Sequence, residues 1–121
     1  MESKRIILEL GTGNDLYGEN YTKAACRAVQ DALHHSSLII FRSLPLDRHA
    51  MQVTVNVGVQ KPELIDRDVV AAEIPYGDVT VVPVVGGLNV VDDVHDTVSV
   101  IATAGIAVHL ELPDKLVLPA G

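Results

Sequence analysis

The sequence predicts a single α+β domain in which one long helix packs on a mixed sheet, in the order β-α-β-α-β-β. Residues 51–59 and 97–112 alternate between apolar and other side chains, as half-buried strands do. A single long helical pattern covers residues 21–35. Valine supplies 19 of the 121 residues, and β-branched side chains favour strands. Residues 113–121 are expected to form a short C-terminal tail of this domain, 1–121.

The N-terminal third predicts a strand, a loop and a helix. Residues 5–10 alternate and indicate the first strand, and residues 11–18 hold three glycines and indicate a loop. Asn20 is placed to cap a helix over residues 21–35. The apolar stripe of this helix is rich in alanine, so we expect close contact with a sheet: Ala25, Ala28, Val29, Ala32 and Leu33. Residues 38–44 are apolar at first but show no clear period.

Residues 51–59 give the clearest strand in the chain. Its odd positions are Met51 and valines, and its even positions include Gln52, Thr54 and Asn56, so the odd side should be buried. Pro62 ends this strand, and Asp66 can cap a short helix over residues 67–72.

The C-terminal half predicts further strands. Residues 79–85 form the third strand, and Gly86-Gly87 is a turn or bulge. Residues 88–91 are either the hairpin partner of that strand or its continuation, and the acidic residues 92–96 form a loop. As one strand, residues 97–112 would span roughly 50 Å, so we expect a bend or bulge at Gly105.

Helix covers only one face of the predicted sheet. The opposite face carries polar positions but must still hide much valine, and so small a domain buries little surface alone. This face is a candidate subunit interface, and we expect a homo-oligomer, a trimer or a larger ring.

Charge and composition exclude several classes of partner. The chain has 9 basic and 16 acidic residues, a net charge of −7, which argues against nucleic acid and anionic membranes. Four aromatic residues are too few for a base-stacking surface. No apolar run approaches the length of a membrane helix, no signal peptide is seen, and the lone Cys26 cannot form an internal disulfide. We therefore expect a soluble cytoplasmic protein.

The glycine loop, residues 11–18, is the sharpest chemical feature. It lies between a strand and a helix, where backbone N–H groups can hold an anion. It matches neither the dinucleotide fingerprint nor the Walker A loop. One interpretation makes the loop a tight turn in which Asp15 accepts loop amides. The other makes Asp15 a site carboxylate, with Gly11 and Gly13 letting a ligand approach the backbone.

Other polar residues allow two interpretations each. Arg27 and Asp31 are spaced for a surface ion pair on a helix, or Arg27 faces the glycine loop or another subunit and binds a carboxylate. His34 and His35 suit the C-terminal end of the helix dipole. His95 lies in the acidic loop, which is either solvated or holds a divalent cation. Cys26 is expected in the core or an interface, and we predict neither a metal nor a cofactor.

The combined pattern resembles an uncharacterised family of conserved hypothetical proteins with an N-terminal GxGxDxHG motif and a TKAAxRAxxDAI-like helix. The resemblance covers roughly residues 5–110, and the chain departs from the motif at Tyr17, where the family has histidine. The matching residues are Gly11, Gly13, Asp15 and Gly18, then Thr22-Lys23-Ala24-Ala25, Arg27-Ala28, Gly58, Pro62-Glu63, Asp66, Pro75-Tyr76-Gly77 and Gly86-Gly87-Leu88.

The element order is also similar to the trimeric α+β fold of the monofunctional chorismate mutases and the YjgF-like enamine deaminases. This likeness implies a ligand site in a cleft between subunits, and it does not fix the function. The first hypothesis is an enzyme or binder of a small polar or anionic metabolite, with Asp15 and Tyr17 as catalytic residues. The predicted ligand-binding residues are Gly11, Gly13, Gly18, Thr22, Lys23 and Arg27. The alternative is a non-catalytic oligomer in which the glycine loop only shapes a turn.

Overall fold

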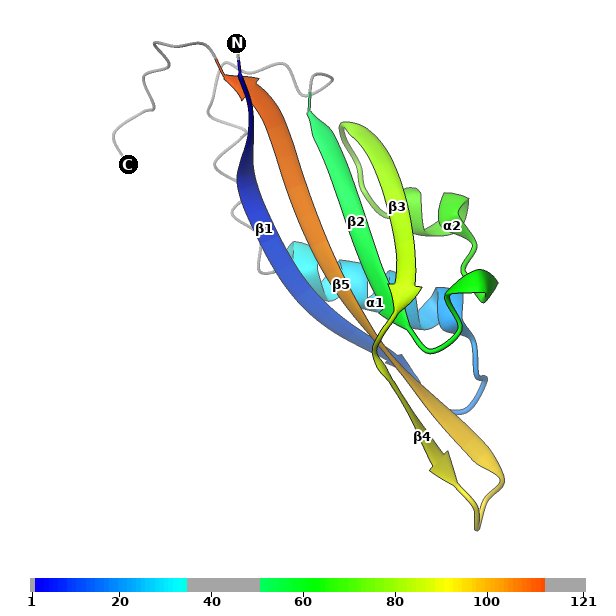
Figure 1. Cartoon of the computed structure of the whole chain (residues 1–121). Coiled ribbons are helices and arrows are strands. Elements are labelled where there is room, and N and C mark those ends of the chain that lie inside the picture. The colour runs from blue at the N-terminus through cyan, green and yellow to red at the C-terminus, as the bar shows by residue number, and fades with distance from the viewer. Residues whose placement is uncertain (1, 35–50, 113–121) are drawn as a thin grey trace.

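The computed structural model describes residues 2–34 and 51–112, and it has the predicted α+β architecture (Figure 1). Five strands form one sheet, and two α-helices and a 3-10 helix complete the described part of the chain. The elements are β1 (Glu2–Asp15), α1 (Tyr21–His34), β2 (Gln52–Val59), the 3-10 helix η3 (Pro62–Leu64), α2 (Arg67–Ala71), β3 (Asp78–Val85), β4 (Leu88–Asp92) and β5 (Thr97–Leu112). Within these residues no helix is long and apolar enough to cross a membrane.

The sheet is mixed and has the strand order β1-β5-β2-β3. Strand β5 pairs antiparallel with β1 on one side and with β2 on the other, and β2 pairs parallel with β3. Strand β4 pairs antiparallel with the first residues of β5, beyond the end of β2, so the two project as an arm (Figure 1). We call residues 88–101 the β4–β5 arm. Of the two predictions for residues 88–91, the hairpin with the third strand was therefore wrong: β4 runs on past Gly86-Gly87 in the direction of β3, and it pairs with β5.

Two predictions about the course of the strands were also wrong, one about the end of the first strand and one about an interruption of the last. The first strand does not end at Leu10 but continues through the glycines to Asp15, paired with β5 throughout. Strand β5 is continuous at Gly105, which keeps Leu10 and Asn56 as its neighbours. The register irregularity lies instead in β1, between Arg5 and Ile7. The long strand needs no break because it twists and curves along its length (Figure 1).

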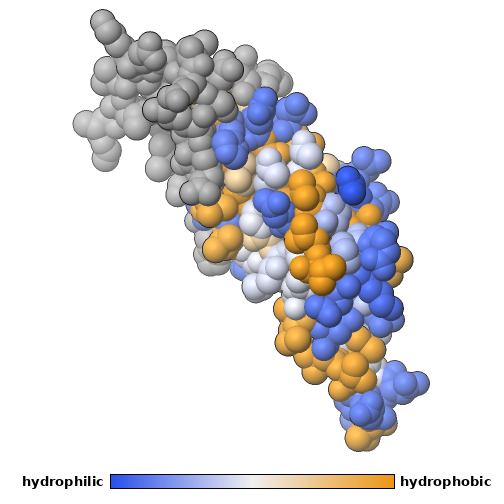
Figure 2. Space-filling model, viewed as in Figure 1, coloured by the Kyte–Doolittle hydropathy of each residue, from blue (hydrophilic) through white to orange (hydrophobic). Residues whose placement is uncertain are grey.

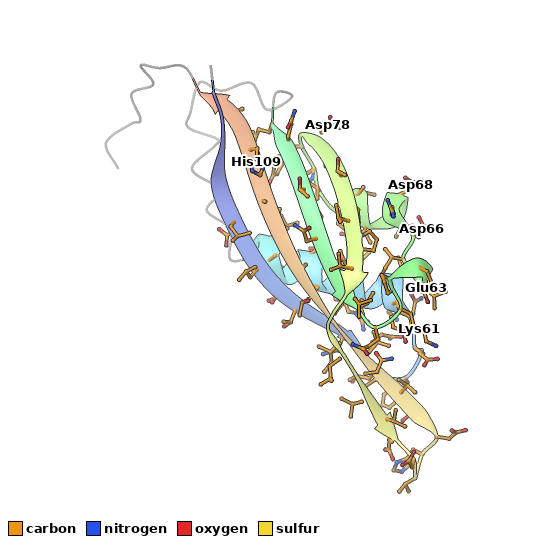
Figure 3. The ribbon with its side chains drawn as sticks, viewed as in Figure 1. Lys61, Glu63, Asp66, Asp68, Asp78 and His109 are labelled. Atoms are coloured by element: carbon orange, nitrogen blue, oxygen red, sulfur yellow. The ribbon has the colours of Figure 1, made fainter. Side chains whose placement is uncertain are left out.

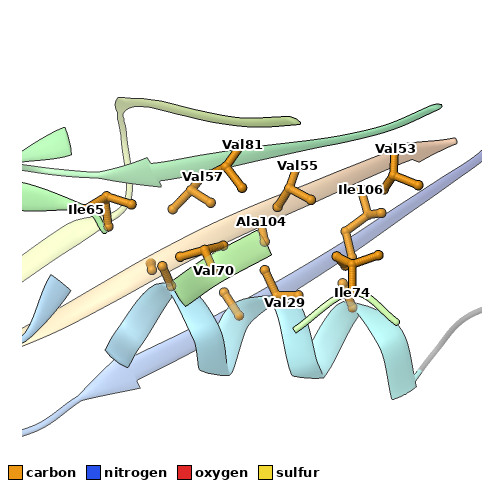
Figure 4. Packing of buried hydrophobic residues seen from close by; sticks show 14 of the residues in the cluster. Val29, Val53, Val55, Val57, Ile65, Val70, Ile74, Val81, Ala104 and Ile106 are labelled. Atoms are coloured by element: carbon orange, nitrogen blue, oxygen red, sulfur yellow. The ribbon is translucent and has the colours of Figure 1, made fainter. Parts of the chain in front are cut away.

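The core lies between the sheet and the helices. The predicted alternation in β2 is confirmed, because Met51 and all four odd valines are at most 1% exposed, whereas Gln52 and Asn56 are exposed. The alanine stripe of α1 is also buried, and α2 covers the same face beside β3 (Figure 4). Asp66 caps α2, as predicted, by accepting hydrogen bonds from the backbone N–H groups of Asp68 and Val69.

The opposite face of the sheet carries no described helix. Figure 2 looks onto this open face and shows apolar side chains over β3 and along the β4–β5 arm. Strand β2, between β3 and β5, carries the polar residues Thr54 and Asn56 at its even positions. The exposed large apolar residues of this face and of the arm include Leu8, Leu10, Val82, Val84, Leu88, Val90, Val91 and Val94.

Cys26 packs at the margin of the core, as expected from its place on α1. Burial, together with the nearby Glu73 carboxylate, raises the pKa of the Cys26 thiol to about 11.

At pH 8 we expect iodoacetamide to alkylate Cys26 of the folded chain about a hundredfold more slowly than Cys26 of the urea-unfolded chain. Because the folded-state pKa is the higher one, this group favours folding below pH 9 and loses that contribution as the pH rises toward 11. Equal alkylation rates in both states would contradict this burial.

Residues 38–44, His35 and the tail 113–121 lie outside the described residues, and the predictions made for them stay predictions.

Candidate functional site

Asp15 organises the connection between β1 and α1. It is the last residue of β1 and the one charged side chain that is buried among the described residues. Its Oδ2 accepts a hydrogen bond of 2.9 Å from the backbone N–H of Asn20. The Asn20 Oδ1 in turn accepts from the N–H of Lys23 at 3.0 Å, which confirms Asn20 as the N-cap of α1. Asp15 therefore closes the turn that starts the helix.

Two cations from α1 converge on the same carboxylate. Lys23 Nζ lies 4.0 Å and Arg27 Nη1 lies 3.7 Å from Asp15 Oδ1. The i,i+4 spacing places both on one helix face, and their side chains are 54% and 49% exposed. The three groups carry a formal net charge of +1, although the whole chain carries −7. This cluster is thus a local cationic site on an acidic protein.

Arg27 and Asp31 also bond to the outer edge of β1. Arg27 Nη1 donates to the Asn14 carbonyl at 2.6 Å, and the Thr12 N–H donates to Asp31 Oδ2 at 2.9 Å. Among residues 2–34 and 51–112, strand β1 is at the edge of the sheet, and no described strand pairs with its outward backbone groups. The pair therefore fixes α1 along β1 and directs Arg27 toward the turn, as one of the two sequence interpretations expected.

An open depression of about 440 Å³ lies at this cluster. It contains five of the eight predicted site residues, with Tyr17 80% exposed at its rim. Its lining is Asn14, Asp15, Leu16, Tyr17, Gly18, Asn20, Lys23 and Arg27. A volume of this order suits a small molecule.

Gly11 and Gly13 have a different role from the one predicted. Both are buried in β1, beneath α1. A Cβ added at Gly13 would lie 2.2 Å from the Ala28 backbone nitrogen, and one at Gly11 would lie 2.4 Å from the Ala28 carbonyl oxygen. The backbone of α1 occupies the space that the prediction gave to a ligand. Gly11 and Gly13 therefore serve the packing of α1 on β1 and do not line the depression.

Thr22 likewise lies outside the depression. Its Oγ1 accepts from the Asp66 N–H at 3.0 Å and donates to the Leu64 carbonyl at 3.4 Å. These bonds join the first turn of α1 to η3 and the start of α2. Thr22 is thus a link between elements.

The sequence did not identify four contributors, and one of them, Asn20, was predicted only as a helix cap. The Asn14 carbonyl holds Arg27, Leu16 lines the depression, and Ser99 Oγ donates to the Leu16 carbonyl at 3.1 Å. Asn14 and Leu16 are the chain neighbours of Asp15, so their places next to a candidate site residue could have pointed to them. Ser99 had none, because it is 83 residues from Leu16 in the chain.

Charged residues elsewhere form no comparable cluster in the described part of the chain. Figure 3 shows Lys61, Glu63, Asp66 and Asp68 around η3 and α2, with Asp66 used as a helix cap. At the arm tip, His95 Nδ1 lies 2.7 Å from Asp92 Oδ2, and this hydrogen bond lowers the pKa of Asp92. Among residues 2–34 and 51–112, no group of three or more His, Cys, Asp or Glu side chains could hold a metal ion.

Fold and site together define a small α+β protein with a cation-flanked carboxylate where its edge strand meets its long helix. The chain belongs to the Lin0512 family of conserved hypothetical proteins, whose model matches residues 5–108. It is similar to the crystal structure of an FtsZ-like protein of unknown function from Nostoc punctiforme, with 32% identity and a TM-score of 0.75. That match covers 93% of this chain and 99% of the other. No curated protein matches the chain.

Proposed function

We propose that the protein binds a small anionic metabolite in the depression at the end of β1. The observation that carries this proposal is the convergence of Lys23 and Arg27, both half exposed, on one buried carboxylate. Lys23 and Arg27 hold the anion through charge-assisted hydrogen bonds. Tyr17 offers a phenol at the rim, and Asp15 orients the two cations. Catalysis by Asp15 and Tyr17 is an extension of this proposal.

Arg27→Gln tests the anion site. The neutral amide removes a charged hydrogen-bond donor, which contributes about 1.5–3 kcal/mol, so inorganic phosphate should bind at least about tenfold more weakly. NMR chemical-shift titration with phosphate at constant ionic strength measures this loss. Arg67→Gln is the matched control, because Arg67 is exposed on α2 and outside the depression. Equal phosphate affinity in both variants would contradict the proposal.

A second candidate is that the connection is only a structural turn. Two observations favour it, namely the Asn20 N–H bond to Asp15 Oδ2 and the position of Gly18, where a Cβ would lie 2.8 Å from the same oxygen. In that case no anion binds, and Asp15 serves the fold alone. The phosphate titration of the unmodified protein separates the two candidates.

We also propose a cytoplasmic homo-oligomer, a trimer or a larger ring, with the depression near a subunit interface. Two observations support it. The open face and the β4–β5 arm expose large apolar residues, which are typical of an interface, and a two-stranded arm has little stability alone. This proposal includes two resemblances. Residues 11–18 resemble the GxGxDxHG motif, and the order of the elements is similar to that of the chorismate mutases and the YjgF-like proteins, whose ligand sites lie between subunits. We expect light scattering at micromolar concentration to give at least three times the mass of the 12.9 kDa chain. A monomeric mass would refute the assembly.

A further inference from the structure

The two oxygens of the Asp15 carboxylate have different surroundings. Oδ2 is used by the protein, since it accepts the Asn20 N–H, and a Cβ added at Gly18 would lie only 2.8 Å from it. Oδ1 lies 3.7 Å from Arg27 Nη1 and 4.0 Å from Lys23 Nζ. Both distances exceed the usual hydrogen-bond length of about 2.7–3.2 Å. Oδ1 therefore has two charges beside it and retains the capacity to accept a hydrogen bond.

The donors around Oδ1 are also only partly used. Arg27 gives one N–H to the Asn14 carbonyl, and a guanidinium has further N–H groups in the same plane. The Lys23 ammonium has three donors, and its side chain is half exposed. A bound molecule thus meets cationic donors and an anionic acceptor within one depression.

We propose that Asp15 selects, among small carboxylates, those with a hydrogen-bond donor next to the carboxylate group, that is, hydroxy- or amino-carboxylates. This inference rests on the proposed anion site. The carboxylate binds Lys23 and Arg27, while the neighbouring hydroxyl or ammonium group donates to Asp15 Oδ1. Because the cations lie within 4.0 Å of Oδ1, the two groups of the ligand must be on adjacent atoms. An anion without a donor leaves Oδ1 without a hydrogen-bond partner, and its own negative charge is repelled by the Asp15 carboxylate.

Two matched pairs of probes test this selectivity on the intact chain. Lactate and propionate differ by one hydroxyl, and glycine and acetate differ by one ammonium group. NMR titration at millimolar concentration and constant ionic strength should give about tenfold tighter binding of lactate than of propionate and of glycine than of acetate, the factor of one ordinary hydrogen bond. Equal affinity within both pairs overturns the selectivity but leaves the anion site standing. If none of the four probes and no phosphate binds, the anion site itself fails.

Asp15→Asn assigns the selectivity to this carboxylate. Loss of the negative charge should weaken glycine binding and strengthen acetate binding, two opposite changes that a merely loosened turn would not produce. Glu19→Gln is the matched control, because it removes the same charge from the same connection outside the lining of the depression. The same direction of change for both probes, or the same result in Glu19→Gln, would overturn the role of Asp15. If Asp15→Asn does not fold, the probe ratios of the unmodified protein still decide the question.

Discussion

Gly13→Ala should abolish or strongly destabilise the fold. The added methyl group would lie 2.2 Å from the Ala28 nitrogen, 2.5 Å from the Arg27 carbonyl carbon and 2.6 Å from the Ala24 oxygen. All three atoms are helix backbone, so no rotamer change relieves the clash, and α1 must move away from β1. The cost should reach or exceed the upper end of the roughly 1–3 kcal/mol typical of overpacking. That is a large part of a total stability of about 5–15 kcal/mol.

Thermal and urea unfolding of Gly13→Ala and Gly105→Ala measures the effect with a matched control. Gly105 is also a strand glycine, but a Cβ there meets only Leu10 Cδ2 at 3.5 Å, an ordinary contact. Gly105→Ala should therefore keep or slightly raise the melting temperature, because alanine has less backbone freedom to lose. If Gly13→Ala melts like the unmodified protein, the glycine does not serve helix packing, and the space above it returns as a possible ligand approach.

The sequence predicted the elements whose side chains repeat with a clear period. Odd positions of β2 and the alanine stripe of α1 are buried because period and burial coincide there. The end of β1 was missed because Gly11 and Gly13 are typical of turns, and the reason for them is a contact with Ala28 of α1. The partner of β4 was missed because a short valine-rich segment can pair with the edge of several strands. The pairing is decided by the length of β5, whose first residues extend beyond the end of β2 and are left to pair with β4.

The sequence predicted which residues form the candidate site better than it predicted how these residues are arranged. Asp15, Lys23 and Arg27 follow from their places at a strand end and on one helix face, and the structure brings them together. The different surroundings of the two Asp15 oxygens could not be predicted, because they depend on the path of the backbone from Leu16 to Asn20. The same limit applies to Thr22, whose bonds to Leu64 and Asp66 join distant segments.

Val55→Asp should leave the chain unfolded. Val55 is fully buried in β2, between Val81 of β3 and Ile106 of β5, and it faces the helices (Figure 4). A carboxylate at this position has apolar neighbours on the same face of both adjacent strands. Burying an unpaired charge costs several kcal/mol, about as much as a small domain has in total. We expect a circular dichroism spectrum without the native sheet and helix signals, and no cooperative melting.

Asn56→Asp is the matched control for this charge. It lies one residue further along β2, is exposed on the open face, and is replaced by a side chain of nearly the same shape. The free energy of unfolding of a surface variant should change by no more than about 0.5 kcal/mol, and the far-ultraviolet spectrum should stay native. A loss of oligomer mass in Asn56→Asp with its native spectrum kept would place the open face in a subunit interface. A native melting temperature for Val55→Asp would show that the odd positions of β2 do not face the core.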